Sequence, residues 1–143
     1  MIDEIAAQLG PDDELLVVCD TERDPITEAA DALPGGVRLL VAGEPEGCSG
    51  KANAIATAME AAAHDRLVWT DDDFYHPPEW LAALQGDYER QGPTTELPFF
   101  EGQDPLSTLL EPMYVMGATA GLTLINKPWG GAVIFERNDL DEA

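Results

Sequence analysis

Three short apolar runs, each followed by a helical pattern, constrain the fold of this chain more than any other feature. The runs are Glu14–Cys19, Val37–Ala42 and Arg66–Thr70. Continuous apolar runs of this length are typical of strands covered on both faces, as in parallel sheets. The repeated strand–helix order predicts an α/β fold with a mainly parallel sheet and helices on both of its faces. We expect residues 1–143 to form a single domain of this class.

Helices and further strands are expected around these runs. Predicted helices cover Ile2–Leu9, Asp24–Leu33, Lys51–Ala63 and Pro105–Leu124, and another is expected to open at Pro77 and Pro78. The second helix starts at an aspartate cap followed by proline, and its predicted buried residues are Ile26, Ala29, Ala30 and Leu33. Trp80, Leu81, Leu84 and Tyr88 are expected to face inward, and Gly117 and Gly121 to allow close packing. Thr94–Phe100 is a predicted edge strand weakened by Pro98, and Ala132–Phe135 is a strand followed by an acidic tail.

Three adjacent carboxylates, Asp71, Asp72 and Asp73, follow the third strand directly. In open α/β sheets, ligands bind outside the carboxyl ends of the strands. Adjacent carboxylates repel one another, and a divalent cation commonly neutralises them. Mg²⁺ or Mn²⁺, bound by the carboxylates together with substrate phosphates, fits this pattern. On an extended backbone Asp71 and Asp73 point the same way. They are therefore the metal and ribose candidates, with Asp72 second, and a solvated acidic loop is the alternative.

Two further candidate residues stand at element ends. Asp20 follows the first strand, which again places an acid at a carboxyl end. Ser49, Gly50 and Lys51 open an alanine-rich helix, so that free backbone N–H groups and one ammonium meet at one place. This geometry favours an anion site. The alternative is a capped helix with an exposed lysine, although Lys51 and Lys127 are the only lysines of the chain.

The charge balance excludes several partners. The chain carries 28 acidic and 7 basic residues, a formal net charge of -21, which opposes binding to nucleic acids and anionic membranes. Such acidity suits a halophilic cytoplasmic protein, in which salt screens the repulsion. Cys19 and Cys48 fit neither a disulfide framework nor a zinc site, so free thiols are expected. The N-terminus lacks a signal peptide, and the uncharged stretch Pro112–Asn126 is too short to span a bilayer but long enough to lie on one.

Four segments, taken together, resemble the ordered motifs of family 2 glycosyltransferases. They are VVCDTERDPIT, GCSGKANAIATAM, LVWTDDDFYHPPEWL and PWGGAVIFERNDL. The ceramide-glucosyltransferase-like branch is the most similar, because a glycine pair there precedes a strand and an Arg-x-x-Leu. The resemblance implies an incomplete Rossmann-like GT-A sandwich. It also implies that the chain is shortened at both ends, with the first strand of the family missing and the catalytic base expected beyond Ala143.

The resemblance implies a role for each candidate. Asp20 would contact the nucleotide base, and Lys51 lies in the glycine–lysine segment of the nucleotide site. Asp71 and Asp73 would hold the ribose and a divalent cation, with Asp72 beside them. Gly130 and Gly131 match the turn that approaches the donor sugar and the acceptor. The implied reaction is metal-assisted, inverting transfer of a hexose from a nucleotide-diphosphate sugar, with a UDP-sugar favoured, to a lipid or saccharide hydroxyl.

Other functions stay open at this point. A module that binds a sugar nucleotide or a metal without turnover is the main alternative. A nucleotidyltransferase would need a glycine-rich, arginine-containing loop near the N-terminus, which is absent, and a halophilic α/β domain without a site explains the acids but not their placement. His76 is expected to be a loop residue and not a ligand. Trp69, Trp80 and Trp129 are expected to pack, with Trp129 the one to test as a stacking surface. The sequence does not decide the identity of the sugar, the nucleotide base or the acceptor. It also leaves open oligomerisation and a location at the inner membrane face.

Overall fold

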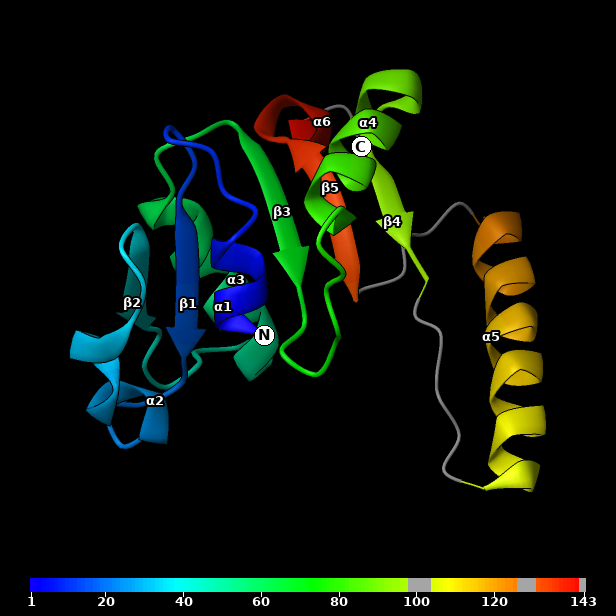
Figure 1. The fold of residues 1–143 in the computed structure, drawn as a ribbon, viewed down its shortest axis with the longest axis horizontal. Coiled ribbons are helices and arrows are strands. Elements are labelled where there is room, and N and C mark those ends of the chain that lie inside the picture. The colour runs from blue at the N-terminus through cyan, green and yellow to red at the C-terminus, as the bar shows by residue number, and fades with distance from the viewer. Residues whose placement is uncertain (98–103, 126–130, 142–143) are drawn as a thin grey trace. The chain divides into compact units, whose positions relative to one another are not determined.

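The computed structural model describes residues 1–97, 104–125 and 131–141 (Figure 1). Four residues singled out above lie outside the described residues, namely Pro98, Lys127, Trp129 and Gly130. The chain forms two compact units, and each is described by itself. The units comprise Met1–Asp65 with His76–Leu81, and Arg66–Tyr75 with Ala82–Ala143.

The first unit is built around a two-stranded parallel sheet. Strand β1 (Leu15–Cys19) pairs with β2 (Val37–Val41), with Leu15 opposite Val37 and Cys19 opposite Val41. Three helical segments complete the path of the chain around these strands, α1 (Ile2–Ala6), α2 (Pro25–Glu28) and the 3₁₀ turn η1 (Ala30–Ala32). Helix α3 (Gly50–Ala61) follows β2 and packs against both strands. A parallel pair joined by a helical crossover is the arrangement that the strand–helix pattern predicts.

The predicted cap of α2 is confirmed, and α3 is also capped, as in the alternative to an anion site. The Asp24 side chain accepts a hydrogen bond from the backbone N–H of Ile26 at 3.0 Å, and Pro25 stands at the start of α2. The Ser49 hydroxyl accepts one from the N–H of Ala52 at 3.2 Å. Each bond satisfies a donor that the first helical turn leaves open, a contribution of about 1 kcal/mol per helix.

A carboxylate secures the opposite end of α3. One oxygen of Glu14 accepts from the N–H of Ala63 at 2.6 Å, and the other accepts from Arg38 Nη1 at 2.7 Å. The same Nη1 donates to the carbonyl of Ala61 at 3.3 Å. Burial raises the pKa of Glu14, but the hydrogen bonds from Ala63 and Arg38 outweigh it, and the pKa is lowered. Glu14 therefore connects the amino end of β1 with the carboxyl end of α3.

The second unit is built around a three-stranded antiparallel sheet. Strand β5 (Ala132–Glu136) lies between β3 (Arg66–Thr70) and β4 (Thr94–Glu96) (Figure 1). The first four residues of β5 are buried, as the continuous apolar run predicts for a central strand. The short β4 is an edge strand, as predicted.

The best-buried side chains belong to β5 and to helix α4 (Trp80–Gln91). Leu84 and Ile134 have no exposed surface. Trp69 packs edge-on against Phe135, with ring centroids 4.6 Å apart. The inward direction predicted for Trp80, Leu81 and Leu84 is confirmed by their burial, whereas Tyr88 is half-buried. Burying side chains of this size contributes about 1.5–3 kcal/mol each.

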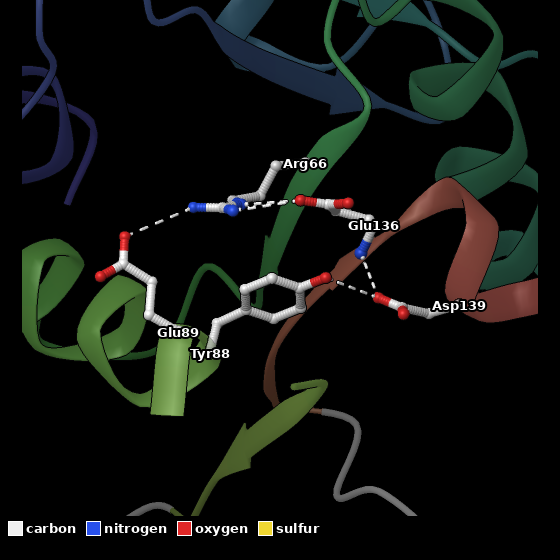
Figure 2. A network of polar contacts seen from close by, with 5 residues as sticks. All are labelled: Arg66, Tyr88, Glu89, Glu136 and Asp139. Atoms are coloured by element: carbon white, nitrogen blue, oxygen red, sulfur yellow. Dashed lines mark hydrogen bonds and ion pairs between the residues drawn. The ribbon is translucent and has the colours of Figure 1, made fainter. Parts of the chain in front are cut away.

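A polar network joins β3, β5, α4 and the short helix α6 (Arg137–Asp141) (Figure 2). Arg66 donates to one oxygen of Glu136 from Nε and Nη2, at 3.2 and 3.1 Å. The Tyr88 hydroxyl donates to Asp139 Oδ2 at 3.0 Å, and the backbone N–H of Glu136 donates to the same oxygen at 2.7 Å. Asp139 lies three residues after the cap position, which is the reciprocal half of a capping box.

The arginine of this network also lies over an aromatic ring. Its guanidinium carbon is 4.7 Å from the centre of the Tyr88 ring, and its Nη1 is 3.9 Å from Glu89 Oε1. Burial, followed by the hydrogen bond to the Asp139 carboxylate, raises the pKa of Tyr88. Arg66 is 40% exposed, so its ion pairs add little stability and mainly hold the geometry.

Helix α5 (Pro105–Ile125) presents an exposed apolar face. The exposed large side chains on it are Leu106, Leu109, Leu110, Met113, Tyr114, Met116 and Leu124. At 3.6 residues per turn they lie on one side of the helix, opposite the half-buried Val115, Ala118 and Thr119. Within the described ranges, no helix has both the length and the apolar character needed to cross a bilayer.

Several expectations about the elements are wrong. The predicted helix over Asp24–Leu33 is broken into α2 and η1, and Ala29 and Ala30 are exposed, because only Ile26 and Leu33 bring large apolar groups. The added Cβ atoms of Gly117 and Gly121 would meet nothing within 4 Å in the described residues, so close packing is not found there. Residues 137–141 of the acidic tail form the helix α6, whose start Asp139 caps.

The expectation of a mainly parallel sheet is confirmed for β1 and β2 alone. Among the described strands, β3 and β4 both pair antiparallel with β5, in a sheet separate from β1 and β2. The strand–helix pattern concerns neighbours in sequence, whereas β5 arrives from more than 60 residues further along the chain. Such a long-range partner leaves no trace in local periodicity. That residues 1–143 act as a single domain remains a prediction.

Candidate functional site

In the first unit, the end of β1 meets the start of α3. Asp20 follows β1 directly and is exposed. Both of its carboxylate oxygens lie 3.7 Å from the point where a Cβ on Gly50 would stand, an ordinary van der Waals distance. Two candidate segments that are 30 residues apart in sequence are therefore brought together.

The first turn of α3 carries the candidate Lys51. This residue is exposed and stands two positions after the cap residue Ser49. The first turn of a helix presents backbone N–H groups and a partial positive charge of about half an elementary charge. The turn can receive an anion, and the Asp20 carboxylate already lies beside it. A ligand placed here would meet a cation and a carboxylate side by side.

Backbone hydrogen bonds carry the pairing of β1 and β2 past the strands. The N–H of Ala42 donates to the carbonyl of Cys19 at 2.9 Å, and the N–H of Gly43 donates to the carbonyl of Asp20 at 3.0 Å. Gly43 has a φ of 76°, a conformation that favours glycine, and it turns the chain into the following loop. Cys19 is buried in the strand, as expected, and burial raises the pKa of its thiol.

Asn53 is a residue of this region that sequence analysis missed. Its Nδ2 donates to the carbonyls of Ala42 and Gly43, both at 3.1 Å. A signal was present in the sequence, because asparagine is a poor helix former and stands alone among the alanines of α3. The sequence does not reveal the partners, because the two carbonyls lie ten and eleven residues earlier, in the loop after β2.

In the second unit, the first residue of the acidic triplet lies beside Gly131. The pairing of β3 with β5 sets Thr70 opposite Ala132. One residue further, the N–H of Asp71 donates to the carbonyl of the buried Gly131 at 2.9 Å. The antiparallel register thus brings two predicted site segments together that are 60 residues apart.

The side-chain directions expected for the triplet assumed an extended backbone, but the strand ends before the triplet begins. β3 ends at Thr70, and Asp72 and Asp73 form a turn. Asp71 is half-buried, while Asp72 and Asp73 are exposed. Strand alternation therefore does not decide which of the three point the same way.

Ligands from outside the triplet would have to complete the coordination of a metal ion there. No group of three His, Cys, Asp or Glu side chains within the described ranges is arranged to hold a metal ion by itself. Mg²⁺ and Mn²⁺ are commonly bound by one or two carboxylates together with water and substrate phosphates. The exposed oxygens of Asp72 and Asp73, with Asp71 next to them, fit that partial donor set.

His76 is a packing residue of the loop after the triplet. It is 2% exposed and lies edge-on to Trp80, with ring centroids 4.4 Å apart. Burial lowers its pKa, the carboxylate of Glu4 acts in the opposite direction, and the ammonium of Met1 adds slightly to the lowering. Both the loop position of His76 and the packing of Trp80 agree with expectation.

Asp139 lies away from the acidic triplet. Arg66 at the amino end of β3 pairs with Glu136, and Asp139 follows beyond that residue. β3 therefore separates Asp139 from Asp71 by about 13 Å of extended chain. The Asp139 carboxylate is also engaged by Tyr88 and the N–H of Glu136. It caps the start of α6.

Comparison with known proteins gives one match. The family model described as Glycosyl transferase family 2 matches residues 1–128. This range contains Asp20, Lys51 and the triplet Asp71–Asp73, and it ends before Gly130 and Gly131. No curated protein and no solved structure gives a match.

Proposed function

Because the chain belongs to glycosyl transferase family 2, we propose that it binds a nucleotide-diphosphate sugar and transfers the hexose to an acceptor hydroxyl. The family supports glycosyltransferase activity in general, with a nucleotide-sugar donor and an acceptor. The observation that carries the proposal for this chain is the meeting of the Asp20 carboxylate with the first turn of α3. A nucleotide needs both a hydrogen-bond acceptor for its base or ribose and a positive site for its phosphates.

We assign the donor as follows. Asp20 accepts hydrogen bonds from the nucleotide base, and Lys51 with the first turn of α3 binds the diphosphate. Asp71 and Asp72 face the ribose, and Asp71 and Asp73 hold a divalent cation. The turn at Gly130 and Gly131 approaches the donor sugar. The hydrogen bond from Asp71 to Gly131 supports placing the sugar near the triplet.

Mg²⁺ or Mn²⁺, when bound, neutralises the charge that develops on the leaving nucleoside diphosphate. Lys51, in the first turn of α3, supplies positive charge for binding phosphate. In the transfer, the acceptor oxygen forms a bond to the anomeric carbon while the bond from that carbon to the phosphate oxygen breaks. The hydroxyl proton passes to a carboxylate base, and attack from the opposite face inverts the anomeric centre. None of the described carboxylates is assigned that role.

We further propose a UDP-sugar as donor and a lipid-linked hydroxyl as acceptor, at the cytoplasmic face of a membrane. The exposed apolar face of α5 supports the lipid acceptor. Its 21 residues include one charged residue, Glu111, in a chain that carries 28 acids. The surface that such a face would meet is not anionic, because the rest of the chain repels anions.

The proposal is tested by isothermal titration of UDP into the protein in molar KCl, with and without Mn²⁺. We expect UDP binding to depend on Mn²⁺. Asp73→Ala should weaken it by at least about tenfold, because replacing a residue that supports a metal typically lowers metal affinity by that factor or more. Asp12→Ala removes one exposed acid in a turn of the first unit and is the matched control, with unchanged affinity expected.

The other outcomes have definite meanings. UDP binding that is equal with and without Mn²⁺ contradicts the metal assignment. Binding without release of UDP from UDP-hexoses in the presence of lipid or saccharide acceptors supports the alternative of a binding module without turnover. A folded protein that binds no nucleoside diphosphate contradicts the donor site itself.

A further inference from the structure

Asn53 connects α3 with the loop that follows β2. Its side-chain amide reaches the carbonyls of Ala42 and Gly43, each at 3.1 Å. Both partners are acceptors, so the amide uses its two N–H groups here and its oxygen remains on the other side. The side chain is half-buried, which strengthens these bonds relative to bonds in water.

The two carbonyls belong to the residues that extend the sheet toward Asp20. Ala42 and Gly43 donate their N–H groups to Cys19 and Asp20, at 2.9 and 3.0 Å. A continuous chain of hydrogen bonds therefore runs from the backbone of Asp20 through Gly43 to Asn53. Asn53 stands one turn after the cap Ser49, in the helix whose first residue lies beside the Asp20 carboxylate.

We propose that Asn53 is a positioning residue for the donor site. This role rests on the function proposed above. It touches no donor atom in this assignment. It acts through Gly43, by holding the carboxyl end of β1 and the first turn of α3 at a constant separation. Without it, the Ala42 and Gly43 carbonyls turn to water, and the loop from Gly43 to Ser49 loses its attachment to the helix.

Glu14 offers a matched comparison at the other end of the same helix. It accepts from the N–H of Ala63 at 2.6 Å and from Arg38 at 2.7 Å. It therefore also attaches α3 to the sheet, but at the amino end of β1, away from Asp20. A variant at Glu14 loosens α3 without touching the end that holds the candidate residues.

The test compares Asn53→Asp and Asn53→Ala with Glu14→Gln in the full chain. Aspartate has the shape of asparagine but at neutral pH cannot donate, so both bonds are lost and two carbonyls face a carboxylate. Alanine loses the bonds without adding charge, and keeps the test valid if the aspartate variant does not fold. Isothermal titration gives the affinity for UDP with Mn²⁺, thermal unfolding gives stability, and amide exchange reports on Gly43.

We expect both Asn53 variants to weaken UDP binding by on the order of tenfold and to speed amide exchange at Gly43. Glu14→Gln is expected to lower the unfolding temperature while leaving the affinity unchanged. Equal affinity in the original chain and the Asn53 variants overturns the positioning role alone. A similar loss of affinity in Glu14→Gln also overturns it, because general loosening of α3 would then suffice. Absence of UDP binding to the original chain overturns the proposed function and this role with it.

Discussion

Polar side chains at the ends of strands and helices organise both units at the scale of single residues. Glu14, Asn53 and Asp139 each bind backbone groups that a strand or helix end leaves open. Such groups are costly to leave without partners in a partly buried position. The local caps Asp24 and Ser49 were predictable, because their partners lie two or three residues away. Glu14 and Asn53 were not, because their partners lie on other elements.

Asp139 can be tested through stability. Replacing it with alanine removes the acceptor for the N–H of Glu136 and for the hydroxyl of Tyr88. We expect Asp139→Ala to lower the free energy of unfolding by about 1 kcal/mol, the typical cost of a lost helix cap. Urea unfolding followed by tryptophan fluorescence measures it.

A double-mutant comparison tests the hydrogen bond between the Tyr88 hydroxyl and Asp139 Oδ2. In the Asp139→Ala background, Tyr88→Phe should have little further effect, since its partner is already gone. Asn138→Ala, exposed on the same helix, is the control and should change stability by less than about 0.5 kcal/mol. Fully additive effects of Asp139→Ala and Tyr88→Phe would mean that the hydrogen bond in Figure 2 contributes nothing.

At the scale of elements, α5 differs from the other helices in the kind of surface it presents. A wide apolar face with little charge is typical of helices that bind an interface or another protein. The neutral character of this face in an acidic chain favours an uncharged lipid surface over an anionic one.

We expect the protein to float with neutral phosphatidylcholine vesicles in molar KCl. Replacing both Leu109 and Met113 with glutamate places two charges on the exposed face and should abolish flotation. The control replaces Ala82 and Ala83, exposed on α4, with glutamate and adds the same charge elsewhere. Failure of the original chain to float, with self-association detected in its place by sedimentation, would assign the face to a second copy of the chain.

At the scale of the whole molecule, the large net negative charge opposes folding. A net charge of -21 on 143 residues opposes compaction unless salt screens it. Both units are small, with sheets of two and three strands among the described residues, and sheets of this size have little stability to spare. Screening is therefore expected to decide whether the chain stays folded.

Raising KCl from 0.1 to 2 M shortens the screening length from about 10 Å to less than about 3 Å. We expect the unfolding temperature to rise by at least about 5 °C. A variant with Asp12, Glu44, Glu46 and Glu60 changed to amides should show a smaller rise. Sucrose, which favours burial without screening, is the control solute. An unfolding temperature independent of KCl would contradict the halophilic interpretation.

The sequence by itself determined the local elements and the ends at which the chemistry stands. The strand Arg66–Thr70 was predicted with its observed bounds, and β1, β2, α3, α5 and β5 to within about two residues. These elements follow from apolar periodicity, caps and glycines, which act between neighbours. The resemblance to family 2 glycosyltransferases came from the same local motifs, and the family match supports it.

Tertiary structure alone decided which distant segments meet. It placed Asp20 beside Gly50, Asp71 beside Gly131, and Asn53 beside Gly43. It also gave β3 an antiparallel partner and turned the acidic triplet out of the extended conformation. The physical reason is that strand pairing and side-chain-to-backbone bonds depend on separation in space. Periodicity along the chain carries no information about that separation.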